Sequence, residues 1–174
     1  MTVKAHCIKP GIPAGLLMIA GVILFLIMGL LPGPAAGQGT ASGQPQIVKV
    51  VPSQKSFSAT LKAFRQEISN AGWSILNMHN MAGVLSERGY TLHPVVILDV
   101  CSGKYSARVL SKDAYRPVSV FMPCRVSIYQ TSEGKVFVAM MNTGAFLEQM
   151  PPEVAEVMSA SDEEIGEVIA RTVR

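Results

Sequence analysis

The sequence predicts a small α+β domain, with an antiparallel-rich sheet backed by helices, that follows one N-terminal transmembrane or signal helix. Three observations lead to this prediction: an uncharged apolar run near the N-terminus, apolar residues at helical spacing, and apolar residues that alternate with polar ones. The chain of 174 residues leaves room for one domain of ordinary size after the apolar run. The expected order of elements is β-α-β-α-β-α-β-β-α.

The N-terminal region divides into three parts by composition. Residues 1–10 carry Lys4 and Lys9, whereas residues 11–32 carry no charge and are long enough to cross a bilayer as a helix. The positive charge before this segment places residues 1–10 in the cytoplasm and the rest of the chain in the periplasm or outside the cell. Residues 33–45 are rich in Gly, Pro, Ala, Ser and Gln, and we expect a flexible linker there.

The apolar segment is consistent with two fates, and the sequence leaves both open. It can remain as an anchor in the inner membrane, which makes the membrane a partner through residues 11–32. It can also act as a signal peptide, because the small residues at 34–37 suit a signal peptidase and cleavage would release the domain into the periplasm. Most of the mean hydropathy of +0.33 comes from this region, so residues 46–174 have the composition of a soluble domain.

The first strand and helix are predicted from their patterns and their ends. Residues 47–51 are almost all β-branched, and Pro52 is expected to end this strand. Ser56 can cap the helix that follows, and Gly72 lies just beyond its end. The apolar residues of this helix recur at helical spacing, and they are Phe57, Leu61, Phe64 and Ile68.

The middle of the domain is predicted to continue as strand, helix, strand and helix. Residues 73–78 indicate a second strand, and residues 81–88 indicate a short helix stopped by Gly89. Residues 94–101 are apolar on both alternations, which is typical of a strand covered on both faces, so we expect this strand to be central. Residues 104–110 are expected to form a short helix, since their apolar side chains fall four apart.

The rest of the chain is predicted to form a hairpin and a last helix. Residues 118–129 alternate between apolar and polar side chains, and this alternation places Cys124 on the side that faces the core. A turn containing Gly leads to the return strand at residues 135–141. The last helix begins at Pro151, and a Ser-x-x-Glu capping box occupies residues 161–164.

Two of these strands resemble those of the family of the domain of unknown function 302 (DUF302). The strand at residues 96–101, Val-Ile-Leu-Asp-Val-Cys, is similar to the family strand that ends in Cys-Asn-Pro. The strand at residues 122–129, Met-Pro-Cys-Arg-Val-Ser-Ile-Tyr, is similar to the family's Leu-Pro-Cys-polar-Val-x-Val-Tyr strand. The resemblance covers about residues 46–170, and it departs from the family where Ser-Gly stands at residues 102–103 in place of Asn-Pro.

The resemblance implies an antiparallel-rich sheet backed by helices, similar to the TATA-binding-protein-like or ferredoxin-like α+β arrangement. It also implies that the protein forms homodimers, as relatives do. It implies no established reaction, so the family narrows the fold far more than the function.

Four residues on two strands are candidate ligand-binding or redox residues. Cys101 and Cys124 are expected in one sheet, where they can be plain buried thiols, a disulfide or a reactive pair. Arg125 is expected on the opposite strand face from Cys124, where it could bind an anion or a partner's carboxylate. Asp99 lies within an apolar strand, where a hydrogen-bonded Asp is the more common occurrence and a catalytic one is rarer.

Signals for a metal, a reaction or a nucleic-acid partner are weak in this sequence. Met78, His79 and Met81 are weak candidates for a copper site, although methionines more often fill gaps in a core. No nucleophile elbow, P-loop or dinucleotide fingerprint occurs, so an enzyme is the less favoured class and no cofactor is assigned. The pI of about 8.8 comes without a stripe of basic residues interleaved with aromatic ones, so no nucleic-acid partner is expected.

We therefore expect a membrane-tethered extracytoplasmic binding module. Its ligand would be a small apolar or anionic molecule, or a protein partner, in a pocket between sheet and helices near Cys101, Cys124 and Arg125. One alternative is a thiol-based redox or sulfur-carrier protein that uses the same two cysteines. A second alternative is a structural subunit that dimerises through an exposed sheet face.

Overall fold

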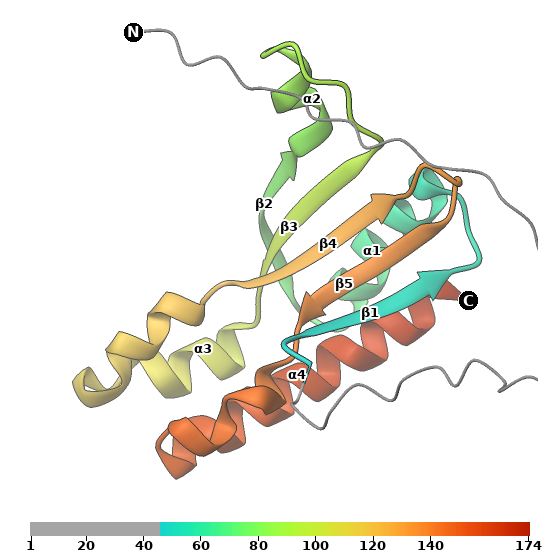
Figure 1. The fold of residues 1–174 in the computed structure, drawn as a ribbon. Helices are drawn as coiled ribbons and strands as arrows, with labels where there is room; N and C mark the ends of the chain where they lie inside the picture. Colours follow the sequence, from blue (N-terminus) through green and yellow to red (C-terminus); the bar gives the residue numbers. More distant parts are fainter. Residues whose placement is uncertain (1–45) are drawn as a thin grey trace, which may run out of the picture. The chain divides into compact units, whose positions relative to one another are not determined.

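Five antiparallel strands form one sheet in the computed structural model of the protein, which describes residues 46–174 (Figure 1). The strands are β1 (Val48–Ser53), β2 (Ser74–Asn80), β3 (Val95–Cys101), β4 (Cys124–Gln130) and β5 (Val136–Met141). Their order across the sheet is β1-β5-β4-β3-β2, so β2 to β5 form a meander and β1 joins beyond β5. The predicted α+β class and the β4–β5 hairpin are confirmed.

Two of the four α-helices cover one side of this sheet. The helices are α1 (Phe57–Asn70), α2 (Met81–Ser86), α3 (Gly103–Leu110) and α4 (Pro152–Val173). In Figure 1, α1 and α4 lie behind the sheet, and the core fills the space between them and the strands. Its fully buried side chains include Phe64, Ile68, Leu98, Val126, Ile128, Val138 and Val168. The predicted Ser56 cap is present, since its hydroxyl accepts a hydrogen bond from the Ala59 backbone at 3.3 Å.

The predicted N-terminal helix and linker, residues 1–45, lie outside the described residues. Within residues 46–174, no helix combines the length and the apolar composition needed to cross a bilayer.

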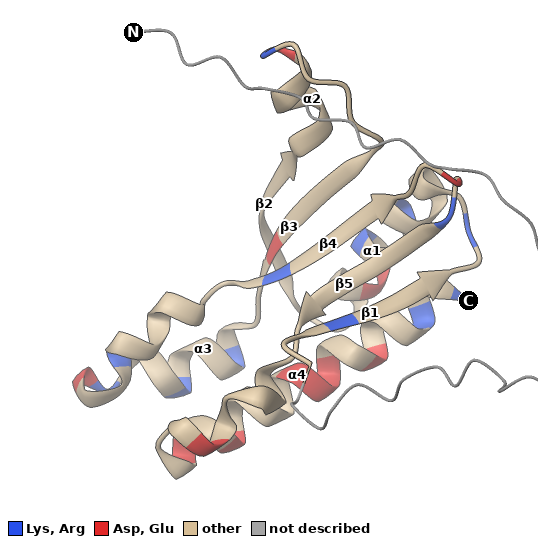
Figure 2. Ribbon diagram, viewed as in Figure 1, with Lys and Arg blue, Asp and Glu red and all other residues tan. Residues whose placement is uncertain are grey.

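Basic residues of α3 and of the turn that follows it face acidic residues of α4 (Figure 2). Lys104 lies 2.7 Å from Glu164, Arg108 lies 2.9 Å from Glu156, and Lys112 lies 2.7 Å from Glu153. The three cations are exposed, so each pair contributes little to stability. They neutralise three of the acidic residues of α4.

The predicted strand at residues 118–123 is wrong. This segment belongs to the 3-10 helix η1 (Asp113–Phe121), and the strand begins only at Cys124. Pro117 and Pro123 have no backbone N–H to donate to a sheet ladder, which disfavours a strand between them in the interior of a sheet. Val120 is 80% exposed, whereas the same alternation from Cys124 onward does separate core from surface.

Three finer predictions are also corrected. Pro52 does not end β1, because β1 is an edge strand with a single neighbour, where a proline is tolerated. β3 is interior but not central, and its second face is only partly covered because both large helices pack on the other side. The capping box at residues 161–164 starts no helix, because α4 is continuous there and Ser161 is buried within it.

Candidate functional site

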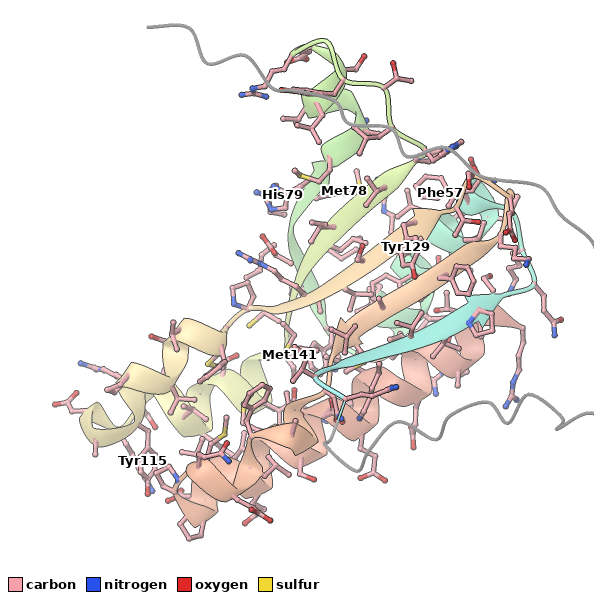
Figure 3. All side chains as sticks on the ribbon, in the orientation of Figure 1. Phe57, Met78, His79, Tyr115, Tyr129 and Met141 are labelled. Atoms are coloured by element: carbon pink, nitrogen blue, oxygen red, sulfur yellow. The ribbon has the colours of Figure 1, made fainter. Side chains whose placement is uncertain are left out.

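The helices α1 and α4 cover one side of the sheet, and we call the other side the open face. Directly paired residues of antiparallel strands share a face, and one such row runs Val50, Ala139, Ser127, Ile97 and His79 across all five strands. Tyr129 and Phe137 form a neighbouring pair on the same side, with their rings stacked at a centroid distance of 5.5 Å. Figure 3 shows Tyr129, His79 and Met141 projecting from this sheet. The open face is therefore largely apolar.

A shallow hollow of about 400 Å³ lies at the end of the open face where β1 begins. Its walls are almost entirely apolar and include Ile47, Val48, Ile97, Ala139, Met141 and Phe146. Ile47 is 62% exposed and Val48 is 44% exposed, so neither is part of the core. Arg125 is the single charged residue in the lining of this hollow.

A polar cluster joins three strands beside this hollow. Asp99 of β3 is only 9% exposed, and its Oδ2 accepts a hydrogen bond from His79 Nε2 at 2.8 Å. Its Oδ1 lies 3.3 Å from Nε of Arg125, which is the paired residue on β4. Asp99 thus holds one side chain from each neighbouring strand, and it accepts the hydrogen bond expected of an Asp within an apolar strand.

A second apolar hollow of about 250 Å³ lies next to the first. It is lined by Val120, Phe121, Met122, Pro123, Arg125 and Met141. Phe121 of this hollow and Phe146 of the first lie with ring centroids 6.2 Å apart, so the two hollows are adjacent. Arg125 and Met141 belong to both.

The two candidate cysteines lie away from the open hollows. Both are free thiols, and each bonds a serine: Cys101 Sγ lies 3.0 Å from Ser106 Oγ, and Cys124 Sγ lies 3.9 Å from Ser161 Oγ. Burial raises the pKa of the Cys124 thiol, and the contact with Ser161 offsets only part of this effect. As expected, Cys124 packs against the core on the same side as Val126.

The pocket expected near Cys101, Cys124 and Arg125 is divided in the structure. One cavity of about 20 Å³ is lined by both cysteines but not by Arg125, and another of about 20 Å³ is lined by Cys124 and Arg125. Each has room for about one water molecule, so neither holds a larger ligand. The cavities that Arg125 shares with apolar residues of the open face are much larger.

The weak metal candidates are not brought together with other metal-binding side chains. His79 bonds Asp99, and within residues 46–174 no group of three or more His, Cys, Asp or Glu side chains gathers at one point. Met78 is paired with the core-facing Leu98, which places it on the opposite side of the sheet from His79. A methionine-based copper site therefore stays a prediction.

Sequence reasoning named Asp99, Arg125 and His79 separately but missed the apolar half of the site. Met141 and Ala139 belong to Val-Phe-Val-Ala-Met-Met, residues 136–141, which is apolar on both alternations. That pattern indicates apolar side chains on both faces of β5 and could have identified the open face.

The comparisons with known proteins agree with this fold. The family described as "Domain of unknown function DUF302" matches residues 49–172. The crystal structure of an uncharacterized conserved DUF302 protein from Bacillus stearothermophilus is similar, with a TM-score of 0.67 and 23% sequence identity. That match covers 75% of this chain and 100% of the Bacillus chain, and at this identity it shows the shared fold alone. No curated protein matches the chain.

Proposed function

We propose, from the premise that this chain belongs to the DUF302 family, that it is a binding module whose binding surface is the open face of the sheet. The observation that carries the proposal is the apolar hollow of about 400 Å³ on a face that α1 and α4 leave uncovered. Sites for ligands are typically concave and apolar with a few placed polar groups, and this hollow has a single charged group in Arg125. We thus retain the expected binding role, but we propose that the binding surface is the open face and not the region around the cysteines.

The module would be tethered outside the cytoplasm. This part of the proposal rests on the apolar residues 11–32 and on Lys4 and Lys9 before them. The described domain begins at the open face, since Ile47 and Val48 line the hollow.

The environment of Cys124 supports the thiol-based alternative less well than the binding module. The thiolate is the reactive form of cysteine, and burial raises the pKa of Cys124 and so lowers its thiolate fraction. The structural alternative, a dimer formed through the open face, uses the same surface as the binding module. A second copy of the chain is therefore one of the species that the following experiment can detect.

Native mass spectrometry of the protein purified from its own membrane tests the proposal. Ala139→Glu places a charge in the middle of the open face, and Ala59→Glu makes the same substitution on the exposed side of α1 as a control. We expect the wild type and Ala59→Glu to retain a bound molecule that Ala139→Glu has lost. A protein that carries no bound species, or that keeps it in all three forms, would contradict the proposal. A bound species with the mass of the chain itself would favour the structural dimer.

A further inference from the structure

We infer that the open face binds an amphiphilic monocarboxylate, whose apolar body fills the hollow beside Met141 and whose carboxylate binds Arg125. This inference rests on the proposed binding function and names the chemical class of its ligand. It follows from two features of the site: an exposed guanidinium with its outer edge available, and apolar walls on both sides of this positive charge.

The guanidinium of Arg125 is exposed and lies beside a buried carboxylate. The Arg125 side chain is 75% exposed, whereas the Asp99 side chain is 13% exposed and lies 3.3 Å from Arg125 Nε. Asp99 is in turn hydrogen-bonded to His79 from the other neighbouring strand, at 2.8 Å. The attraction of this carboxylate keeps the guanidinium beside the hollows before an anion arrives, and a cation that is partly placed beforehand loses less conformational freedom on binding.

Asp99 contacts only one edge of the guanidinium. The contact is at Nε, and within residues 46–174 no other carboxylate lies within ion-pair distance of Arg125. The outer edge, formed by the two terminal nitrogens, is therefore available for a second carboxylate. Two parallel N–H donors on one edge match the two oxygens of a carboxylate, and this geometry is specific as well as strong.

The contact between Asp99 and Arg125 is close but does not include a hydrogen bond. The Oδ1 atom of Asp99 is buried, yet it accepts no hydrogen bond of good geometry within the described residues. Buried polar atoms in folded proteins nearly always have a hydrogen-bond partner, so this oxygen can still accept a hydrogen bond from Arg125. A ligand that holds the outer edge of the guanidinium could bring Nε into line with this oxygen.

The surroundings of Arg125 define the rest of the ligand. The hollows of about 400 Å³ and 250 Å³ lie next to each other, and among the described residues Arg125 is the only charged one in the lining of either. Volumes of about 300 to 1,000 Å³ are typical of sites for small molecules. One positive charge between two apolar hollows is complementary to one negative charge on an apolar molecule, whereas a polyanion would leave charges unpaired on apolar walls.

Methyl NMR of methionines tests the inference on the full chain in lipid nanodiscs. Met141 lines the open hollows, whereas Met158 of α4 is 3% exposed and lines neither of them, so the two methyl groups report on the open face and on the core. The probes are octanoate and its uncharged counterpart 1-octanol, with empty nanodiscs to correct for partition into lipid. The variants are Arg125→Gln and, as a control, Arg116→Gln, which removes an exposed arginine from η1.

We expect octanoate to shift the Met141 methyl resonance and to leave that of Met158 in place. The dissociation constant of octanoate should rise at least tenfold in Arg125→Gln and stay unchanged in Arg116→Gln, while 1-octanol binds both variants as it binds the wild type. An unchanged Met158 resonance in each variant shows that the core is intact.

Three outcomes would overturn the inference. Equal affinity for octanoate and 1-octanol would leave the open face as a binding surface but remove the carboxylate from its ligand. A Met141 resonance that moves with protein concentration and not with octanoate would identify a second copy as the occupant. No response of Met141 to either probe, together with no bound species in the native mass spectra, would overturn the proposed function as well.

Discussion

Cys124 and Arg125 are adjacent in the sequence but belong to different environments. The side chain of Cys124 packs against the core and contacts Ser161 of α4, whereas that of Arg125 lies on the open face beside Asp99. The pleat of β4 separates them, so the cation cannot lower the pKa of the thiol by direct contact. At the scale of single residues, the site thus divides into a partly buried thiol and an exposed cation.

We expect Cys124 to be alkylated slowly at neutral pH in the folded, reduced protein, because burial raises the pKa of its thiol and the thiolate is the form that reacts. The raised pKa also stabilises the fold in a defined range of pH. This contribution is fully present below the ordinary thiol pKa of about 8.5 and is lost as the pH rises through the raised value.

Labelling with iodoacetamide, followed by peptide mass spectrometry, measures the alkylation rate, and urea unfolding between about pH 7 and 10 measures the change in stability. Cys124→Ala should lose about 1–2 kcal/mol at pH 7, through a small cavity, and should show a flatter dependence on pH. Rapid labelling of Cys124 would instead favour the sulfur-carrier alternative over the binding module.

At the scale of elements, successive side chains of β4 point alternately to the core and to the open face. Val126 and Ile128 are fully buried, whereas Ser127 lies in the row of the open face between Ala139 and Ile97. Val126→Asp should therefore unfold the domain, because an unpaired buried carboxylate costs several kcal/mol, a large part of a total stability of about 5–15 kcal/mol. Ser127→Asp, the matched control, should be much milder. Circular dichroism during urea unfolding measures both, and equal losses would show that the two faces of β4 had been assigned the wrong way round.

The elements that could be predicted from the sequence are those whose signals are local. The helix after Ser56 and the β4–β5 hairpin carry their caps, turns and periodicity within a few residues, and both are present. The alternation at residues 118–123 gave a wrong strand, because side-chain periodicity does not record the N–H donors that Pro117 and Pro123 lack. The Ser-x-x-Glu spacing at residues 161–164 is equally compatible with a helix start and a helix interior, so only packing distinguishes them.

The candidate site was predictable residue by residue but not as an arrangement. Asp99, Arg125 and His79 stand out in the sequence as polar residues in apolar strands, yet they come from three strands. Their contact depends on the register of β3 with both neighbours, which no short stretch of sequence contains. The hollow also needs Phe146, which follows β5 and reaches the open face only because the chain folds back there.

At the scale of the whole molecule, the open face and the predicted membrane attachment are joined through the start of β1. The apolar residues 11–32 are followed by 13 residues, at positions 33–45, that are predicted to be a linker, and Ile47 then lines the hollow. A ligand with an apolar body is concentrated in membranes, so a module held at the membrane surface would meet it there. The proposed ligand class and the proposed location therefore support each other, and both depend on the orientation of the chain.

That orientation leads to the last prediction, which concerns the side of the membrane on which the domain lies. A reporter enzyme that is active only after export, fused after the exposed Arg174, should be active in cells that produce the full chain. The reason is the bias of Lys4 and Lys9 before the apolar residues 11–32, since the next charge does not come until Lys49.

The matched control is the same fusion with Lys4→Glu and Lys9→Glu, which removes the bias without shortening the apolar segment, and its activity should fall. A second fusion with a reporter that works only in the cytoplasm should show the reverse pattern. Activity of the cytoplasmic reporter in the unaltered chain would place the domain inside the cell. The domain and its open face would then lie on the cytoplasmic side, and the extracytoplasmic part of the proposed function would be wrong, although the binding role of Arg125 could still be tested independently.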